Sequence, residues 1–490
     1  MNKQFVLCAL ATLLLLMLPL LGCWPTGKPA VQHNDRGLVL VEEGRYEEAI
    51  TEFNKAIELD PEFAEAYKNR GNLYFAAGEY DKAMADFNRA IELNPNNAQA
   101  YNYRGTAYFA IWEYDKATVD FSKAIELDPE LALAYNNRAS TYNMKGQFDK
   151  AIADSDRAIE LAPELSSAYT NRGFAYKKKG NLVKAIANYD KVIELDPQFV
   201  MAYNNRGSAY LAAGDYDKAM ADFNRAIELN PNHAEVYNNR GSVYYIGKRE
   251  YDKAIADFSR AIELNPDYGQ AYTNRGLVYT TKGEHDAAIA DFNRAIELNP
   301  NNARAYTYRG SAYLAIGEYD EAMADFNRAM ELEPYYAEAY NYRGGAYFAA
   351  AEYDKAIADY SKAIELYPDY AEAYNYRGSV YYIGKREYDK AIADFSSAIQ
   401  LDPDYAEAYN NRGLAYGAKG ESDKAIADFN SAIELNPNMA NSYYGRALVY
   451  DALDRKADAI ADLEKCIELS QKPGLTQAAQ QKLDELRSQP

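Results

Sequence analysis

The sequence predicts an all-α fold in which helix–turn–helix units repeat along the chain as a solenoid. Proline recurs from Pro61 to Pro437 at intervals of 34 residues, apart from two intervals of 35. The composition is skewed as well, with 47 Tyr but only 2 Trp and 3 His among 490 residues, and a copied unit explains this skew. A fixed period over so long a chain indicates a repeat architecture rather than one compact core.

Residues 1–22 have the features of a secretion signal. Lys3 precedes an apolar run, Phe5–Leu21, that is short for a membrane span. The run leads into a Leu-Leu-Gly-Cys sequence ending at Cys23, which resembles the lipobox of bacterial lipoproteins, although Leu21 is a less usual residue at its place. The resemblance implies that cleavage removes residues 1–22 and that the sulfur of Cys23 receives a diacylglyceryl group.

Lipidation of Cys23 would place the chain at a membrane. Two or three acyl chains anchor a protein stably, and residues 23–29 would be the lipidated cysteine and a short tether. We therefore expect a lipid-anchored protein of the cell membrane, on its periplasmic or extracytoplasmic face. The alternatives are an ordinary signal peptide or an uncleaved anchor, in which Cys23 has no role.

The repeated unit is defined by residues 64–97, with Ala64 as position 1. Position 4 is Tyr67, position 8 is Gly71, position 24 is Phe87 and position 32 is Pro95. Positions 3, 4, 8 and 11 have the spacing of one stripe on a first helix, and positions 20, 24, 27 and 28 that of a stripe on a second. Glycine at position 15 suits a left-handed exit from the first helix, and Asn96 and Asn97 are candidate caps for the next.

This pattern resembles the tetratricopeptide repeat family, and the resemblance covers thirteen tandem units over residues 30–473. Position 20 is Ala in all thirteen units, and position 4 is Tyr in twelve, with His33 as the exception. Position 8 departs from Gly at Ala139 and Ala447. The resemblance implies a right-handed superhelical solenoid whose concave groove is lined by the first helices.

Three features depart from a uniform array. The two longer proline intervals come from one residue inserted in the same phrase, at residues 246–250 and 383–387. Residues 474–490 form one further amphipathic pattern, which predicts a C-terminal capping helix. Cys466 replaces the alanine of position 27 and is therefore expected to be a small core residue rather than a reactive thiol.

The sequence offers little for catalysis, cofactors or metals. The formal charge of −20 disfavours nucleic acid as a partner. The cysteines and histidines form no cluster with metal-ligand spacing, and no phosphate-binding loop is present. We expect no enzyme activity, no cofactor and no metal site.

Position 6 carries asparagine in many repeats and is expected to face the groove. An asparagine amide can pair with both sides of a peptide unit, so such residues predict a site for extended polypeptide. The pattern is similar to the asparagine ladder of O-linked N-acetylglucosamine transferase. The alternative is that asparagine was merely copied when repeats were duplicated. The predicted residues are Asn69, Asn137, Asn171, Asn205, Asn239, Asn274 and Asn411.

From the ninth repeat onward, tyrosine replaces asparagine at position 6, as Tyr308, Tyr342 and Tyr376. Position 2 is acidic in the same region, as Glu338, Glu372 and Glu407, and position 12 is apolar or aromatic. These tyrosines predict binding anchors, and the carboxylates would favour lysine or arginine in the partner. The alternative is that the aromatic stripe serves packing.

Arginine occupies position 7 in every repeat, from Arg36 to Arg446. Position 23 is acidic in twelve of the thirteen, with Asn188 as the exception. A charge close to a packed seam needs a partner. The pattern therefore predicts an arginine–carboxylate bridge between the two helices of each repeat.

Together these features predict a membrane-tethered scaffold that binds extended polypeptide segments of other proteins in its groove, as an adaptor for envelope assembly. A carbohydrate-binding envelope lipoprotein is the first alternative, because asparagine and tyrosine also suit sugars. A self-associating structural array is the second. The sequence does not identify the partner.

Overall fold

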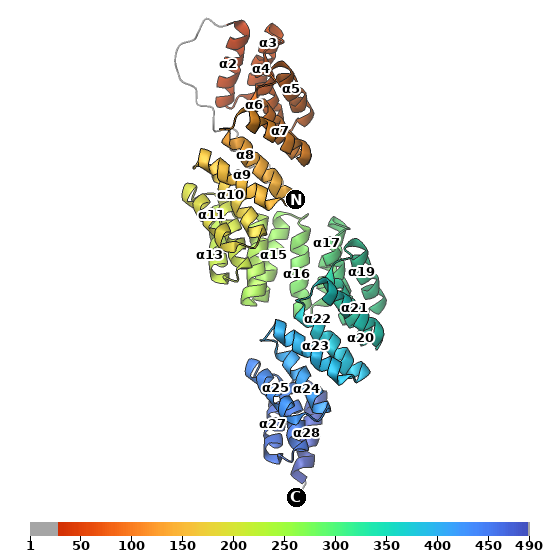
Figure 1. Cartoon of the computed structure of the whole chain (residues 1–490). Helices are drawn as coiled ribbons and strands as arrows, with labels where there is room; N and C mark the ends of the chain where they lie inside the picture. The colour runs from red at the N-terminus through yellow and green to blue at the C-terminus, as the bar shows by residue number, and fades with distance from the viewer. Residues whose placement is uncertain (1–27, 489–490) are drawn as a thin grey trace. The chain divides into compact units, whose positions relative to one another are not determined.

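Each repeat contributes two helices joined by a short turn, and the even-numbered helices are the first of each pair. The computed structural model describes residues 28–488, and these contain no strand, so the predicted all-α fold of helix–turn–helix repeats is confirmed. The chain divides into two units, up to Arg249 and from Glu250, which are called here the N-terminal half and the C-terminal half. Figure 1 labels their helices along the chain.

The N-terminal half contains the first six repeats and the first helix of the seventh. Its helices are α2 (Pro29–Glu42), α3 (Tyr46–Leu59), α4 (Ala64–Ala76), α5 (Tyr80–Leu93), α6 (Ala98–Ala110), α7 (Tyr114–Leu127), α8 (Ala132–Met144), α9 (Phe148–Leu161), α10 (Ser166–Lys178), α11 (Leu182–Leu195), α12 (Val200–Ala212), α13 (Tyr216–Leu229), α14 (Ala234–Ser242) and the π-helix η1 (Val243–Lys248).

The C-terminal half continues the same alternation and ends in one additional helix. Its helices are α15 (Tyr251–Leu264), α16 (Gly269–Lys282), α17 (His285–Leu298), α18 (Ala303–Ile316), α19 (Tyr319–Leu332), α20 (Ala337–Ala349), α21 (Tyr353–Leu366), α22 (Ala371–Ser379), the π-helix η2 (Val380–Lys385), α23 (Tyr388–Leu401), α24 (Ala406–Ala418), α25 (Ser422–Leu435), α26 (Ala440–Ala452), α27 (Lys456–Leu469) and α28 (Pro473–Ser488).

Small and aromatic side chains fill the space between the two helices of a repeat. On α5, Ala83, Phe87 and Ala90 are fully buried, and Ile91 is nearly so. They lie on one stripe at the helical spacing that the sequence predicts. Ala66 of α4 is fully buried as well. The core of the solenoid is therefore a succession of such layers, one for each repeat.

Glycine at position 8 allows the aromatic ring at position 24 to lie against the backbone of the first helix. A Cβ atom on Gly71 would lie 2.8 Å from the ring of Phe87, which is closer than side chains approach. The two repeats that carry alanine at position 8 have no aromatic ring at position 24, since Ala139 is matched by Ser155 and Ala447 by Leu463. Positions 8 and 24 therefore depend on each other.

The turns within and between repeats follow the predicted chemistry. Gly78 leaves α4 with a left-handed φ of 78°, and the side chain of Asn97 accepts a hydrogen bond from the backbone of Ala100 at the start of α6. Trp112 and Ala351 stand at the glycine position of their repeats and adopt φ values of 68° and 58°. This conformation costs an L-residue about 1–2 kcal/mol.

The two one-residue insertions are absorbed as π-helices. Val243–Lys248 and Val380–Lys385 each widen the end of a first helix. The following residues, Arg249 and Arg386, adopt left-handed φ values of 53° and 55°. A wider helical turn accommodates an extra residue while the residues before and after it keep their faces.

The predicted arginine–carboxylate bridges are confirmed. Arg206 donates from Nε to Oδ2 of Asp222 at 2.8 Å and from Nη2 to Oδ1 at 2.6 Å, and its Nη1 donates to Asp190 of the preceding repeat at 2.6 Å. This third bond, to position 25, was not predicted, and it joins neighbouring repeats. The same two-pronged bridge links Arg70 to Asp86, Arg104 to Asp120, Arg138 to Asp154, Arg275 to Asp291, Arg309 to Asp325, Arg343 to Asp359, Arg377 to Asp394, Arg412 to Asp428 and Arg446 to Asp462.

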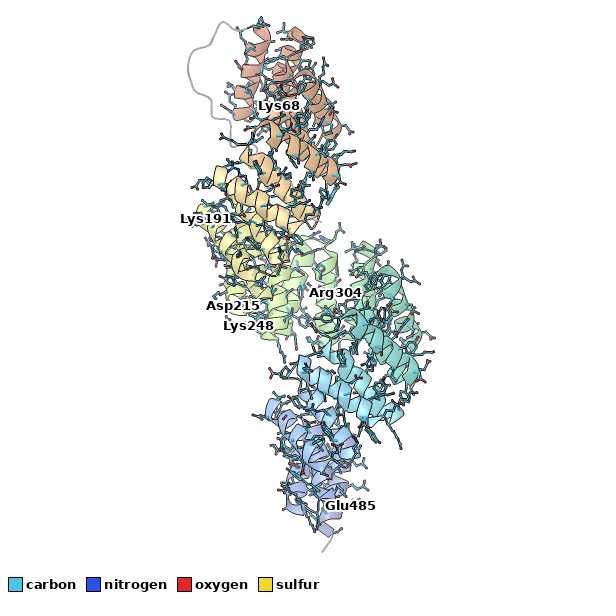
Figure 2. The ribbon with its side chains drawn as sticks, in the orientation of Figure 1. Lys68, Lys191, Asp215, Lys248, Arg304 and Glu485 are labelled. Atoms are coloured by element: carbon cyan, nitrogen blue, oxygen red, sulfur yellow. The ribbon has the colours of Figure 1, made fainter. Side chains whose placement is uncertain are left out.

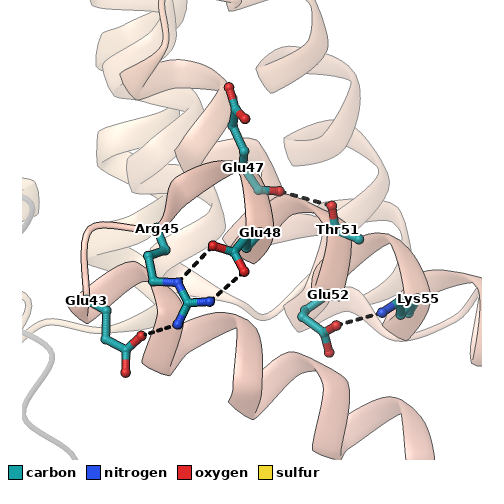
Figure 3. A network of polar contacts seen from close by, with 7 residues as sticks. All are labelled: Glu43, Arg45, Glu47, Glu48, Thr51, Glu52 and Lys55. Atoms are coloured by element: carbon teal, nitrogen blue, oxygen red, sulfur yellow. Dashed lines mark hydrogen bonds and ion pairs between the residues drawn. The ribbon is translucent and has the colours of Figure 1, made fainter.

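Polar side chains of the first repeat pair with one another. Arg45 lies between Glu43 and Glu48 and donates to both carboxylates, as Figure 3 shows. Lys55 donates to Glu52 at 2.8 Å in the same view. Glu52 also lies 2.6 Å from Nδ1 of His33, the residue that replaces tyrosine at position 4. Several charged side chains of the first repeat are thus paired within that repeat.

The additional helix α28 packs against α27 through Leu483 and Leu486, which share a buried cluster with Leu463 and Cys466. Burial raises the pKa of the Cys466 thiol to about 11, in keeping with a packed side chain. The signal sequence of residues 1–22 and the predicted lipidation site Cys23 lie outside the described residues. Among the helices that the structure describes, none combines the length and apolar character needed to cross a membrane.

Candidate binding groove on the first helices

The asparagines of position 6 make hydrogen bonds between neighbouring repeats. Nδ2 of Asn69 donates to Oδ1 of Asn34, at position 5 of the preceding repeat, at 2.9 Å. Asn171 donates to the backbone and side-chain oxygens of Asn136 at 3.2 Å and 3.0 Å. Equivalent bonds run from Asn137 to Asn102, from Asn239 to Asn204 and from Asn411 to Asn375.

These bonds give five of the seven predicted asparagines a structural role. Asn69 and Asn171 are also buried, with 7% of each residue exposed. Asn205 is the exception, because the preceding repeat has Thr170 at position 5 and its hydroxyl bonds to the backbone. Asn274 accepts a hydrogen bond from Gln270 of its own helix. Peptide binding by the asparagines therefore stays a prediction, and Asn205 alone among them makes no hydrogen bond to another described residue.

Two lysines on first helices of the N-terminal half are withdrawn from solvent, Lys68 being buried and Lys177 partly buried. Lys68 of α4, labelled in Figure 2, contacts Glu65 and lies 3.4 Å from the amide oxygen of Gln99. Lys177 of α10 donates to the hydroxyl of Ser208. Burial, with a smaller contribution from Lys178, lowers the pKa of Lys177 to about 8.

In the C-terminal half, a network of tyrosines and charges surrounds Tyr308. Its hydroxyl donates to Oε2 of Glu338 at 3.0 Å, and the hydroxyl of Tyr336 donates to the same oxygen at 2.7 Å. Arg304, labelled in Figure 2, lies over the Tyr308 ring at 5.3 Å. Tyr342 meets the same ring edge-on, with ring centres 6.3 Å apart. Tyr308 is thus held by protein groups on several sides.

An open groove of 1510 Å³ lies beyond this network, on the first helices of the tenth to thirteenth repeats. We call it the aromatic groove. It brings together the predicted Tyr342, Tyr376 and Asn411, while Tyr308 lies outside its lining. The residues that line it are Leu314, Asn341, Tyr342, Gly345, Phe348, Tyr360, Tyr370, Glu372, Asn375, Tyr376, Ser379, Ile383, Tyr405, Glu407, Asn410, Asn411, Asn436, Asn438, Met439, Ala440, Asn441, Glu468, Leu469, Ser470, Gln471, Lys472 and Leu475.

Two tyrosines of the aromatic groove were not predicted from the sequence. Tyr370 and Tyr405 stand directly before α22 and α24, at the last position of their repeats. Burial raises the pKa of both phenols above the usual range, with smaller contributions from nearby Glu and Tyr side chains. The hydroxyl of Tyr405 accepts a hydrogen bond from Asn375 at 3.2 Å. Their recurrence with the repeat period was the signal that could have revealed them.

The carboxylates of the aromatic groove are open to solvent. Glu372 and Glu407 are exposed, and neither makes a hydrogen bond or ion pair with another residue of the described range 28–488. Burial is the main cause that raises the pKa of Tyr376, and the negative charges of these two carboxylates raise it further, which places them near its hydroxyl. The groove can therefore receive a donor-rich, positively charged group. Within the same range, no three His, Cys, Asp or Glu side chains are arranged to hold a metal ion.

Several solved structures are similar to this chain. The Cut9–Hcn1 tetramer of APC/C matches with a TM-score of 0.55 at 15% identity, over 99% of both chains. Yeast Tom70 matches with a TM-score of 0.45 at 20% identity, over 87% of this chain and 96% of its own. A tetratricopeptide repeat protein from Parabacteroides merdae matches with a TM-score of 0.43 at 20% identity, over 51% of this chain and 99% of its own. At these identities the likeness concerns the fold alone.

Family models give the relationship directly, whereas a search of the curated proteins found no match. A model described as TPR repeat matches residues 37–78, 140–180, 175–214, 248–283, 276–317, 344–384 and 385–420. Models described as tetratricopeptide repeat match residues 64–97, 98–131, 121–153, 200–233, 223–256, 303–336, 406–439 and 440–473. The period, the paired helices and these matches agree, and the chain belongs to the tetratricopeptide repeat family.

Proposed function

We propose that this protein is a lipid-anchored scaffold that holds extended polypeptide segments of other proteins in the aromatic groove. The observation that carries the proposal is the groove itself, an open volume of 1510 Å³ with tyrosine and asparagine side chains along its length. Tyrosine supplies large, rigid contact area and a hydrogen-bonding tip, which makes it a frequent anchor at protein interfaces. The family is typically non-enzymatic, and we propose a binding role without catalysis.

An extended chain suits this groove better than a compact ligand. Equivalent positions of successive first helices present similar side chains at regular intervals, so contacts can repeat along a strand. Asn375, Asn410 and Asn411 are bonded to neighbouring side chains, which fixes their orientation before a ligand arrives. A groove that is already ordered loses little entropy on binding.

Site-specific photo-crosslinking tests the proposal. A photoreactive phenylalanine analogue at Tyr376 should form cross-links to polypeptide in envelope extracts, and mass spectrometry would identify the cross-linked segments. The same analogue at Tyr335, which is 84% exposed and does not line the groove, is the matched control. Equal cross-linking from both positions would remove the groove from the proposal.

Carbohydrate binding is the second candidate, because tyrosine rings and asparagine amides also suit sugar faces and hydroxyls. A glycan array separates the two candidates. Specific glycan binding that is lost in Tyr376→Ala would identify the ligand of the groove as a sugar instead of a polypeptide. Self-association is the third candidate, and light scattering of the purified chain over a range of concentrations tests it.

The proposal of a lipid anchor is supported by the sequence ending at Cys23, in which Leu20 and Gly22 fit the lipobox. The first described helix begins at Pro29, so that few residues would separate an anchor from the first repeat. Metabolic labelling with a fatty-acid analogue should mark the wild-type chain and leave Cys23→Ser unlabelled. Equal labelling of both would exclude acylation at Cys23, and with it the proposed role as an adaptor held at the envelope.

A further inference from the structure

We infer that the aromatic groove selects a polypeptide segment that carries an arginine, with the guanidinium group bound among Asn341, Glu372 and Glu407. This inference rests on the proposed function and adds to it the chemistry of the partner. It depends on three independent features of the groove, which are an unpaired buried acceptor, an open space on the same helix face and two free carboxylates.

The unpaired acceptor is Oδ1 of Asn341, which has no hydrogen-bond partner among the described residues although the side chain is 94% buried. At the same position one repeat later, Oδ1 of Asn375 accepts from Nδ2 of Asn411 at 3.0 Å. Asn341 lacks such a donor because Tyr376 occupies position 6 of the next repeat. A buried acceptor without a donor is costly, and a ligand N–H would supply what is missing.

The open space lies along the same helix face. Gly345 follows Asn341 by four residues on α20, so both line the groove on one side of the helix. A Cβ atom on Gly345 would meet only the hydroxyl of Tyr360, at 3.7 Å. The neighbouring repeats carry Ser311 and Ser379 at this position. The absence of a side chain at Gly345 leaves room for a ligand group.

The free carboxylates are Glu372 and Glu407, on the two first helices that follow α20. Both are exposed, line the groove and make no ion pair with another residue in the range 28–488. Lys472 is the cation of the lining, and Glu468 lines the same part of the groove. Charge complementarity therefore calls for a cation in the partner.

Arginine satisfies all three features at once. Its planar guanidinium has five donors and no acceptor, pairs with carboxylates in two-pronged geometry and stacks on aromatic faces. Tyr376 is 42% exposed and offers such a face. A lysine ammonium would meet the charge but offers no planar face to stack on the ring and no two-pronged pairing with a carboxylate. The remaining groove exceeds what one side chain fills, which favours an arginine within a polypeptide over a free cation.

Selection from a random peptide library on the full-length chain provides the probe. Peptides that bind wild type but not Gly345→Tyr, a variant whose new ring fills the open space, should be enriched in arginine. Replacing that arginine by citrulline, which has the same shape without the charge, should weaken binding at least tenfold. Replacing it by lysine should weaken binding three- to tenfold. Groove-dependent peptides that show no arginine preference would overturn the inference while supporting the proposed function, and a library with no groove-dependent peptide would contradict both.

Variants of the chain locate the site. Glu372→Gln with Glu407→Gln should weaken the arginine peptide at least tenfold and leave its citrulline form unchanged. The matched control, Asp320→Asn with Glu434→Gln, removes two exposed carboxylates outside the groove lining and should have no effect. An equal loss in both double variants would reduce the effect to net charge and overturn the inference.

Asn341→Leu tests the acceptor separately from the fold. It should weaken the arginine peptide about fivefold and keep or raise the urea midpoint of unfolding. A lowered midpoint with unchanged binding would make Asn341 merely structural. Spermine, a free cation, should compete only at concentrations at least a hundredfold above those of the peptide. Competition at equal concentration would reassign the site to a polyamine.

Discussion

The first helices of the two halves differ in the residue most often found at position 6, which is asparagine in five repeats of the N-terminal half and tyrosine in three of the C-terminal half. In the N-terminal half, Asn69, Asn137 and Asn171 donate to oxygens of the preceding repeat and tie neighbouring first helices together. In the C-terminal half, Tyr342 and Tyr376 occupy the same position, and the groove is open beside them. Position 6, together with position 5 of the preceding repeat, therefore decides whether neighbouring repeats hydrogen-bond to each other or leave polar groups available to a ligand.

The halves also differ in charged side chains of their first helices. Lys68 is buried and Lys177 partly buried on first helices of the N-terminal half, whereas Glu372 and Glu407 are exposed and unpaired on those of the C-terminal half. Both halves share the arginine–carboxylate bridge and the packing of glycine against an aromatic ring. The two halves thus share the contacts that join the helices of a repeat and differ in the side chains that their first helices present. Each of these features can be tested separately.

The arginine bridge should give the largest effect, and an equal one in both halves. Arg206→Leu and Arg343→Leu each leave a buried aspartate without its partner, so the free energy of unfolding should fall by about 3 kcal/mol. Urea denaturation followed by circular dichroism measures this loss. Arg225→Leu, which removes only an exposed pair with Glu228, should leave the urea midpoint unchanged. A loss of stability in only one of the two variants would show that the bridge does not stabilise both halves equally.

Lys177 should give the next largest effect, with a size that depends on pH. Its folded pKa of about 8 lies below the ordinary 10.5, so the fold disfavours its charged form. Above pH 10.5 the amine is neutral in both states and burial carries no penalty. As the pH falls through about 8, the amine is charged in both states and the penalty is complete.

Lys177→Leu should therefore stabilise the fold by about 2 kcal/mol at pH 7, and the gain should vanish above pH 10.5. Leucine fits because Leu211 and Leu314 occupy the same position in other repeats. Urea midpoints of wild type and variant at pH 7 and pH 10.5 give the comparison. A gain that does not change with pH would assign the effect to packing rather than to the buried charge.

Two adjacent glycines of α20 have different roles. Gly344 packs against the Tyr360 ring within its repeat, whereas Gly345 lines the aromatic groove. In Gly344→Ala the new Cβ would lie 3.0 Å from the Tyr360 ring, and the crowding should cost about 1–2 kcal/mol. In Gly345→Ala the nearest atom is 3.7 Å away, and the better helix former should add about 0.5–1 kcal/mol. Thermal unfolding of the two variants measures both. Destabilisation by Gly345→Ala would contradict the open space assigned to the groove.

The asparagine tie should give the smallest effect. Asn171→Ala breaks bonds to two oxygens of Asn136 and should cost about 1 kcal/mol. Asn205→Ala is the matched control at the same position, and because Asn205 makes no such bond it should leave stability unchanged within about 0.3 kcal/mol. If the two variants lost equal stability, the inter-repeat bonds would not distinguish these residues, and the comparison between the halves would fail.

Much of this arrangement was predictable because it depends on contacts at a fixed sequence separation. The bridge from Arg206 to Asp222 spans sixteen residues, and the same pair of residue types recurs in other repeats. The choice of groove residues was predictable only in part. The amide of Asn171 looked available for a ligand, but whether it was free depended on Asn136 in the preceding repeat.

The sequence by itself determined the repeat, the pairing of helices, the bridge between them and the small residues of the core, because each follows from periodicity within one unit. The tertiary structure alone decided which groups remain free. Asn341 and Asn375 are identical residues at identical positions, yet one is bonded and the other is not, since the next helix presents Asn411 to Asn375 and Tyr376 to Asn341. A hydrogen bond needs two partners in reach, and that condition becomes visible only when neighbouring repeats are packed together.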